Sequence, residues 1–295
     1  MSFATDLVAE LERATAGQPI PRVRALHLPP PEAAASKNGE FCALELDDGA
    51  LGLSYVLLDD TLQQLIAAGD GVVGMDALEL ARAFATACGA GMRAGAGDAG
   101  VVACSPAAAA QALHRTLGFA ACNALSRTVM DRMGFAPPRA ADSIGGIAPQ
   151  AGDHVGMVGL FSPLLKQVTA AGARLTVVEL NPDYVGDYEG YRVTLDAAEL
   201  EDCNKVLSTS TILLNHTVDE MLAHCRRAER IVLIGPSAGC LPDPLFARGV
   251  TVVGGSWVTD RAGFVDALRG GDSWSAFAYK FALTTADWPG LQTRH

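Results

Sequence analysis

Five short apolar runs, separated by helical patterns, dominate the second half of this 295-residue sequence. The runs occupy residues 154–161, 174–180, 206–214, 231–234 and 250–253. Strands that alternate with helices form βαβ units, and their crossover connections are right-handed in nearly all known cases. The second half is therefore predicted to be an α/β domain built on a doubly wound parallel sheet.

The first half mixes strand and helix patterns. Residues 41–58 predict a β-hairpin, because the first arm alternates, Asp47-Asp48-Gly49 forms the turn and the second arm is apolar. Helices are predicted at the N-terminus and over residues 75–88 and 105–133, the last with a break near Gly118. Residues 134–153 are rich in Pro and Gly, which is typical of a domain crossing. We expect a smaller α+β domain at residues 1–138 and the parallel-sheet domain at residues 139–295.

Composition narrows the class of protein. The net charge is −11, and the sequence has no basic stripe of the kind that nucleic-acid binding requires. No apolar run reaches the roughly 20 residues that span a bilayer, and the N-terminus lacks the pattern of a signal peptide. The seven cysteines occur singly, which favours reduced thiols. We expect a cytoplasmic protein with no nucleic-acid or membrane partner.

Because nearly half of the residues are apolar, a homodimer is also expected.

The ends of the predicted strands are candidate ligand sites, because open parallel sheets bind ligands beyond the carboxyl ends of their strands. Small and polar residues gather at these ends, where they leave room for a ligand and offer hydrogen bonds. They are Ser162, Glu179, Asn181, Thr209, Thr211, Gly235, Pro236, Ser237 and Ser256.

A nucleotide-type ligand is one possibility. Gly156 and Gly159 form an incomplete glycine motif, and Glu179 follows Gly159 by 20 residues, at the end of the next strand. An acidic residue at that place can hold ribose hydroxyls. The alternative is that the two glycines only permit close packing of a helix on a strand.

Other residues are candidates for metal binding or for nucleophilic catalysis. The acidic residues of segment 179–189 offer oxygen ligands, or form an ordinary solvated loop. Cys240 and His216 are softer candidate ligands, although no CxxC or HxxxH pair is present. Cys240 needs a base and a lowered pKa to act as a nucleophile, and is otherwise a small apolar residue. Ser237 lies in G-P-S-A-G, but the strand–turn–helix context of a hydrolase nucleophile is missing.

Several segments resemble the bacterial and archaeal family described as "putative heavy-metal chelation". They are VGMVGLFSPLL (155–165), VVELNP (177–182) with Gly186-Asp187, STSTILLNHTVDEML (208–222) and VLIGPSAGCLPDPLFARGV (232–250). LGLSY (51–55) and LGFAACNALS (117–126) match more weakly. The sequence departs from the family pattern at Ala238-Gly239-Cys240, which follows Gly-Pro-Ser.

The resemblance implies an enolase-like N-terminal domain, a Rossmann-like C-terminal domain and a site in the cleft between them. On the Rossmann-like side, the residues that match the family's motif positions are Glu179, Asp187, Thr209, Thr211, Asn215, Gly235, Pro236 and Ser237. On the N-terminal side they are Asn123 and the segment from Gly52 to Tyr55. We expect a metal ion or a metal-chelating metabolite as ligand. If the protein is an enzyme, Glu179, Asp187 and Asn123 are the candidate catalytic residues. A nucleotide- or S-adenosylmethionine-dependent enzyme is the alternative.

Overall fold

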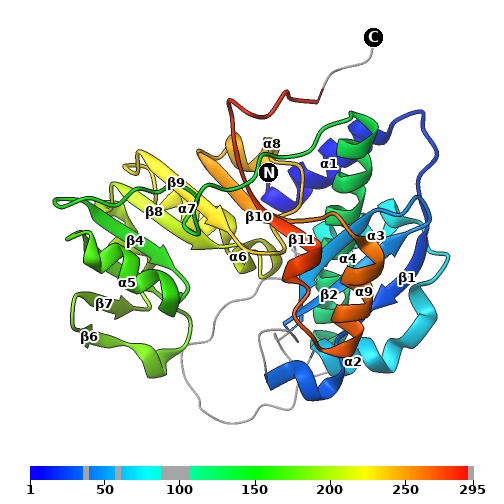
Figure 1. Ribbon diagram of the computed structural model, residues 1–295, viewed down its shortest axis with the longest axis horizontal. Coiled ribbons are helices and arrows are strands. Elements are labelled where there is room, and N and C mark those ends of the chain that lie inside the picture. The colour runs from blue at the N-terminus through cyan, green and yellow to red at the C-terminus, as the bar shows by residue number, and fades with distance from the viewer. Residues whose placement is uncertain (36–39, 57–60, 88–105, 292–295) are drawn as a thin grey trace. The chain divides into compact units, whose positions relative to one another are not determined.

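The structure is a computed structural model that describes residues 1–35, 40–56, 61–87 and 106–291 (Figure 1). The chain divides into two compact units. Unit 1 comprises residues 1–136, 239–241 and 257–279, and unit 2 comprises residues 137–238, 242–256 and 280–295. The boundary expected from the sequence, between residues 138 and 139, stays a prediction.

Unit 1 combines a three-stranded antiparallel sheet, ordered β1-β2-β3, with helices. Its elements are α1 (Phe3–Thr15), β1 (Val23–His27), η1 (Pro31–Ala35), β2 (Phe41–Leu46), β3 (Leu51–Tyr55), α2 (Thr61–Ala68), η3 (Gly69–Val72), α3 (Ala77–Ala87), α4 (Pro106–Arg132), α9 (Arg261–Gly270) and η6 (Ser275–Phe277). Strands β2 and β3 pair from Phe41 opposite Tyr55 to Glu45 opposite Leu51, so the predicted hairpin is present. The hairpin was predicted to extend to residue 58, but residues 57 and 58 lie outside the described residues.

Helix α4 runs without a break from Pro106 to Arg132, so the break predicted near Gly118 is wrong. Gly118 serves packing: a Cβ atom there would lie 2.7 Å from the Leu80 carbonyl oxygen of α3. Gly52 has the same role on the other side of α4. A Cβ atom on Gly52 would lie 2.0 Å from the Ala120 carbonyl oxygen and 2.3 Å from the Ala124 nitrogen. The missing side chain therefore lets β3 pack directly on the backbone of α4.

Unit 2 contains most of an eight-stranded sheet in the order β11-β10-β9-β8-β4-β5-β7-β6. The strands are β4 (His154–Val158), β5 (Arg174–Val178), β6 (Gly186–Tyr188), β7 (Tyr191–Thr194), β8 (Lys205–Thr209), β9 (Arg230–Ile234), β10 (Val252–Val258) and β11 (Ala278–Thr284). The helices are α5 (Ser162–Ala170), η4 (Pro182–Tyr184), η5 (Ala197–Asp202), α6 (Thr211–Leu214), α7 (Val218–Ala223) and α8 (Asp243–Phe246). Strands β10, β9, β8, β4, β5 and β7 pair in parallel, and β6 pairs antiparallel with β7.

The core of unit 2 forms where the central strands bury large apolar side chains, including Val155, Met157, Val177, Leu207 and Val232. Burial of such side chains on a parallel sheet supplies the main stabilising free energy of the unit. The structure thus has the predicted mixed α/β class, with a large parallel-rich sheet and a smaller antiparallel sheet.

Each predicted apolar run overlaps a strand, although the fifth run, 250–253, includes only the first two residues of β10. The third run differs in its second half. Residues 205–209 form β8, whereas Thr211–Leu214 turns into helix α6. Strands β6, β7 and β11 were not predicted, because two are very short and carry few apolar residues. Within the described ranges, no helix combines the length and the hydropathy needed to cross a membrane.

The contact between Gly52 and α4 predicts that Gly52→Ala destabilises unit 1 strongly. The new methyl group would meet backbone atoms that cannot move independently, so we expect a loss of about 3 kcal/mol or more in the free energy of unfolding. Urea denaturation followed by circular dichroism measures this change. Gly71→Ala is the matched control, because a Cβ atom on Gly71 meets nothing within 4 Å. Equal stability of the two variants would contradict the packing described here.

Candidate functional site

The carboxyl ends of four neighbouring parallel strands, β9, β8, β4 and β5, meet at one edge of the sheet in unit 2. We call this group the strand-end cluster. It contains Gly159, Glu179, Thr209, Ser210, Thr211, Gly235 and Ser237. The cluster therefore brings together residues that are up to 78 positions apart in the sequence.

Glu179 connects the ends of three strands. Its Oε2 atom accepts a hydrogen bond from the Leu160 nitrogen after β4, and its Oε1 atom accepts one from the Leu180 nitrogen, both at 2.8 Å. The Glu179 nitrogen donates to the Thr194 carbonyl oxygen of β7 at 2.9 Å. Because the half-buried carboxylate receives two backbone N–H groups, its position and orientation are fixed.

Two hydroxyl pairs lie at the ends of β8 and β9 in the strand-end cluster. The Oγ1 atoms of Thr209 and Thr211 are 2.9 Å apart, and the Oγ atoms of Ser210 and Ser237 are 3.0 Å apart. Ser210 and Ser237 are almost completely buried, whereas Thr209 and Thr211 are partly exposed. The two threonines are therefore the hydroxyl groups that a ligand can reach.

Glycine allows these strand ends to approach one another. A Cβ atom on Gly159, where φ is +86°, would lie 3.1 Å from Thr209 Cγ2. A Cβ atom on Gly235 would lie 2.0 Å from Ser210 Oγ. Gly159 therefore places the end of β4 beside Thr209, and through Leu160 it links Thr209 to Glu179. The Gly-Pro-Ser turn after β9 has the same function next to Ser210.

Four other predicted residues of unit 2 lie around these strand ends in less direct roles. Ser162 is exposed and is the first residue of α5. Asn215 is buried, and its Oδ1 atom accepts hydrogen bonds from the nitrogen and the hydroxyl of Thr217. His216 has a φ of +63° in this same turn, and Pro236 is half-buried. Asn215 thus shapes the turn after α6.

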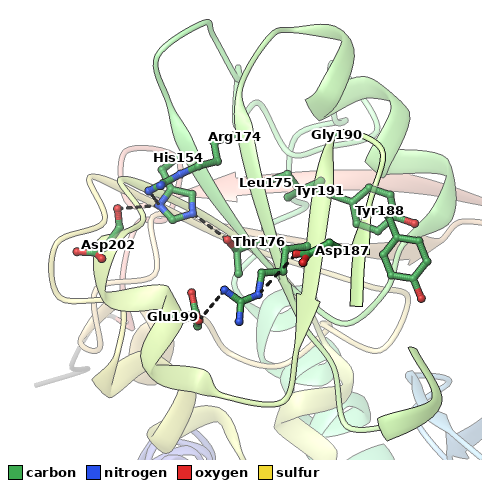
Figure 2. A pocket seen from close by; sticks show the side chains of 11 residues that line it. His154, Arg174, Leu175, Thr176, Asp187, Tyr188, Gly190, Tyr191, Glu199 and Asp202 are labelled. Carbon is green, nitrogen blue, oxygen red and sulfur yellow. Dashed lines mark hydrogen bonds and ion pairs between the residues drawn. The ribbon is translucent and has the colours of Figure 1, made fainter. Parts of the chain in front are cut away.

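Asp187 does not belong to the strand-end cluster. It lies on the edge strand β6 opposite Arg192 of β7, and its side chain is 91% exposed. Asp187 lines a separate pocket of about 400 Å³. Figure 2 shows this pocket, with His154, Arg174 and Thr176 on one side and Tyr188 and Tyr191 on the other. Sequence reasoning missed it, although the polar residues Arg174 and Thr176 alternate with apolar ones in β5.

The predicted residues of unit 1 have contacts within that unit. Asn123 is buried in α4, and its Nδ2 atom donates to the Leu53 carbonyl oxygen of β3 at 2.7 Å. Tyr55 packs edge-on against Phe41, with ring centroids 5.6 Å apart. Burial, with a smaller contribution from the Glu40 carboxylate, raises the pKa of Tyr55. Through its hydrogen bond to Leu53, Asn123 joins α4 to the sheet.

The described thiols are poorly suited to metal binding. Burial raises the pKa of Cys240 to about 12, and the same cause, as the largest one, raises the pKa values of Cys42, Cys203 and Cys225 to about 12. A thiol must lose its proton to bind a soft metal or to act as a nucleophile. In the part of the chain that the structure describes, no three His, Cys, Asp or Glu side chains gather in a way that could hold a metal ion. These residues therefore do not fit a directly coordinated heavy metal.

We predict that Glu179→Gln lowers the free energy of unfolding by about 1–2 kcal/mol, because an amide has one acceptor oxygen for the two backbone N–H groups. Urea denaturation of the purified variant measures the change. Asp183→Asn, an exposed substitution in the following segment, is the control and is expected to leave stability unchanged. An unaltered unfolding midpoint for Glu179→Gln would show that the two hydrogen bonds do not hold the strand ends.

We also predict that Cys240 in the native protein resists alkylation by iodoacetamide at mildly alkaline pH, since its thiol is buried and protonated. Mass spectrometry of the peptide that contains Cys240 measures the modification. The same peptide should be modified fully in urea. Rapid modification of Cys240 in the folded protein would contradict this prediction and would make Cys240 a candidate nucleophile or metal ligand.

Comparison with known proteins identifies relatives of this chain. Residues 146–287 match the DUF364 family, described as "Putative heavy-metal chelation". A DUF364 protein of unknown function from Desulfitobacterium hafniense has a similar structure, with a TM-score of 0.63 and 18% identity over 95% of this chain and 99% of that one. Another, from Pyrococcus horikoshii, has a TM-score of 0.66 and 17% identity over 96% of this chain and all of that one.

At these identities the two solved structures establish the fold alone. No curated protein matches the sequence. The resemblance found in segments 155–165, 177–182, 208–222 and 232–250 is confirmed, because all four lie within the matched residues. Residues 146–287 of this chain therefore match the DUF364 family model, described as "Putative heavy-metal chelation".

Proposed function

We propose that the strand-end cluster of unit 2 binds a small polar metabolite that itself chelates a metal ion. The observation that carries the proposal is that Glu179, Thr209 and Thr211 lie at the same edge of the sheet, at the ends of β5 and β8, the two strands that flank β4. Carboxylate and hydroxyl groups at the carboxyl edge of a parallel sheet are suited to hydrogen bonding with a polar ligand. The family description adds a metal-related role.

In this proposal the metal is carried by the metabolite. Protein ligands for a bare heavy-metal ion would be thiolates or clustered imidazoles. The buried thiol of Cys240 has a pKa of about 12, and the residues described by the structure include no group of three metal-binding side chains. We therefore assign neither Cys240 nor His216 to metal binding. The metabolite completes the coordination, and the protein recognises its outer hydrogen-bonding groups.

The residues have distinct roles in this binding mode. Thr209 and Thr211 donate and accept hydrogen bonds through their reachable hydroxyls, while Ser210 and Ser237 support the turn behind them. Glu179 accepts a hydrogen bond from a hydroxyl or amine of the ligand, and it is the first candidate for an acid–base group if a reaction occurs. Gly159 and Gly235 let the strand ends pack against Thr209 and Ser210, which sets the positions of these hydroxyl groups.

The nucleotide or S-adenosylmethionine alternative has weaker support. Glu179 does lie at the end of the strand next to β4, as such a site requires. Gly156, however, lies inside β4, and a Cβ atom there would lie 2.6 Å from Leu200 Cδ2 and 3.1 Å from Cys203 Sγ. This glycine serves the packing of η5 on the sheet, which favours the packing interpretation of the motif.

Two further properties belong to the same proposal. A cytoplasmic location is supported by the cysteines, because Cys42, Cys203, Cys225 and Cys240 are buried thiols. A homodimer is supported by exposed apolar side chains that follow β5 and β7, among them Leu180, which is 65% exposed, and Leu195, which is 52% exposed. Grouped apolar side chains at a surface are typical of association sites.

The proposal predicts that nickel–citrate raises the melting temperature of the protein more than Ni²⁺ or citrate alone. Thermal-shift measurements with each probe, and with S-adenosylmethionine for comparison, test this. Thr209→Val should weaken nickel–citrate binding about tenfold, a loss of roughly 1.4 kcal/mol. Thr169→Val is the control, because that hydroxyl bonds only within α5. Stabilisation by Ni²⁺ alone would contradict the proposal, and stabilisation by S-adenosylmethionine alone would favour the alternative.

A further inference from the structure

The pocket of Figure 2 lies at the opposite end of the strands from the strand-end cluster. His154 and Arg174 are the first residues of the parallel strands β4 and β5, and Tyr191 is the first residue of β7. The pocket volume of about 400 Å³ is within the range of small-molecule sites. The two regions are therefore separate candidate sites on one sheet.

Polar side chains occupy one face of the sheet under this pocket. In the strand register, Thr176 of β5 is opposite Arg192 of β7, and Arg192 is opposite Asp187 of β6. Next to them, His154 Nε2 lies 2.9 Å from Thr176 Oγ1. Parallel strands are usually apolar on both faces. Exposure at the sheet edge accounts for Arg192 and Asp187, whereas Thr176, which is buried, extends the polar row toward the centre of the sheet.

The charges along the pocket are unequally distributed. At one end Arg174 donates to His154 Nδ1, and no carboxylate among the described residues lies within 4 Å of its guanidinium group. At the other end a single guanidinium group, that of Arg192, faces two carboxylates: Asp187 at 4.0 Å and Glu199 at 3.4 Å. The pocket thus has an excess positive charge at Arg174 and an excess negative charge near Arg192.

His154 adds no positive charge to the end of the pocket that contains Arg174. Burial and the nearby Arg174 guanidinium lower the pKa of His154, which keeps the imidazole neutral near pH 7. The third carboxylate of the lining, that of Asp202, pairs with Arg227 at 3.2 Å. Arg174 is therefore the cation available to a ligand at this end of the pocket.

The tyrosines add an aromatic wall. The rings of Tyr188 and Tyr191 are stacked, with centroids 4.9 Å apart and planes only 5° from parallel. Tyr188 is 44% exposed, so part of its ring surface is open to a ligand. Such a surface packs well against an apolar or aromatic group.

From these observations we infer that the pocket between Arg174 and Glu199 is a second ligand site, and that it binds a zwitterion of the α-amino acid type. The carboxylate of the amino acid pairs with Arg174, its ammonium group pairs with Glu199 and Asp187, and its side chain packs on Tyr188. The site does not depend on the function proposed for the strand-end cluster.

A calorimetric screen of the standard L-amino acids against the full chain tests this inference. We expect at least one of them to bind at millimolar concentration. For L-phenylalanine, the matched probes are phenethylamine, which lacks the carboxylate, and 3-phenylpropionate, which lacks the ammonium group. For whichever amino acid binds best, the analogues that lack one charged group should bind about tenfold more weakly or worse.

Variants locate the site. Arg174→Gln and Glu199→Gln should each weaken binding of the best amino acid about tenfold, whereas the exposed Arg226→Gln should leave it unchanged. Melting temperatures show that the variants are folded. The inference is overturned if no amino acid binds the wild-type protein, or if Arg174→Gln and Glu199→Gln bind as tightly as Arg226→Gln. It is also overturned if the singly charged analogues bind as well as the zwitterion.

Discussion

The in-register parallel pairing of β9, β8, β4 and β5 is the constraint on which the rest of unit 2 depends. Parallel strands have all their carboxyl ends at one edge of the sheet, so residues from distant segments become neighbours there. Gly159 and Gly235 let these ends approach within van der Waals contact, and Glu179 fixes two of them through backbone hydrogen bonds. A larger side chain at either glycine would separate the hydroxyl groups from the carboxylate.

The same pairing gives the two ends of the sheet different chemistry. The carboxyl end presents hydroxyl groups and one immobilised carboxylate, which suits recognition by hydrogen bonding. The amino end presents Arg174, Arg192 and Glu199 with an excess of opposite charge at its two sides, which suits a dipolar ligand. Between the two ends, the apolar core around Val155, Met157 and Val177 keeps the strands rigid, so each group of polar side chains has a fixed geometry.

Burial makes the described thiols poor ligands for the metal that the family description suggests. Moving a thiolate out of water costs free energy, and this cost raises the pKa of Cys240 far above neutrality. A protein that handles metal through a bound metabolite avoids this cost, because the metabolite supplies ligands that are deprotonated in water. The hydroxyl groups and the fixed carboxylate of the strand-end cluster are compatible with that division of roles.

Much of the architecture followed from local patterns in the sequence. The apolar runs that begin at residues 154, 174 and 231 each became a strand, because a central parallel strand must be apolar on both faces. The hairpin around Gly49 followed from its turn chemistry. The edge strand β6 and its neighbour β7 were not predicted, because both are short and β6 has no buried residue. The unbroken course of α4 through Gly118 was not predicted either, because it depends on close packing against α3.

The candidate residues were predictable in kind but not in their grouping. The sequence determined that Glu179, Thr209 and Ser237 lie at strand ends, and the parallel pairing then placed these ends at one edge of the sheet. Only the tertiary structure decided that Asp187 joins Arg174 and Tyr188 in a separate pocket. It also decided that Asn123 bonds to Leu53 and that Cys240 is buried. The physical reason is that local patterns set which backbone conformation a segment adopts, whereas strand order and burial set its neighbours, its charge environment and its access to water.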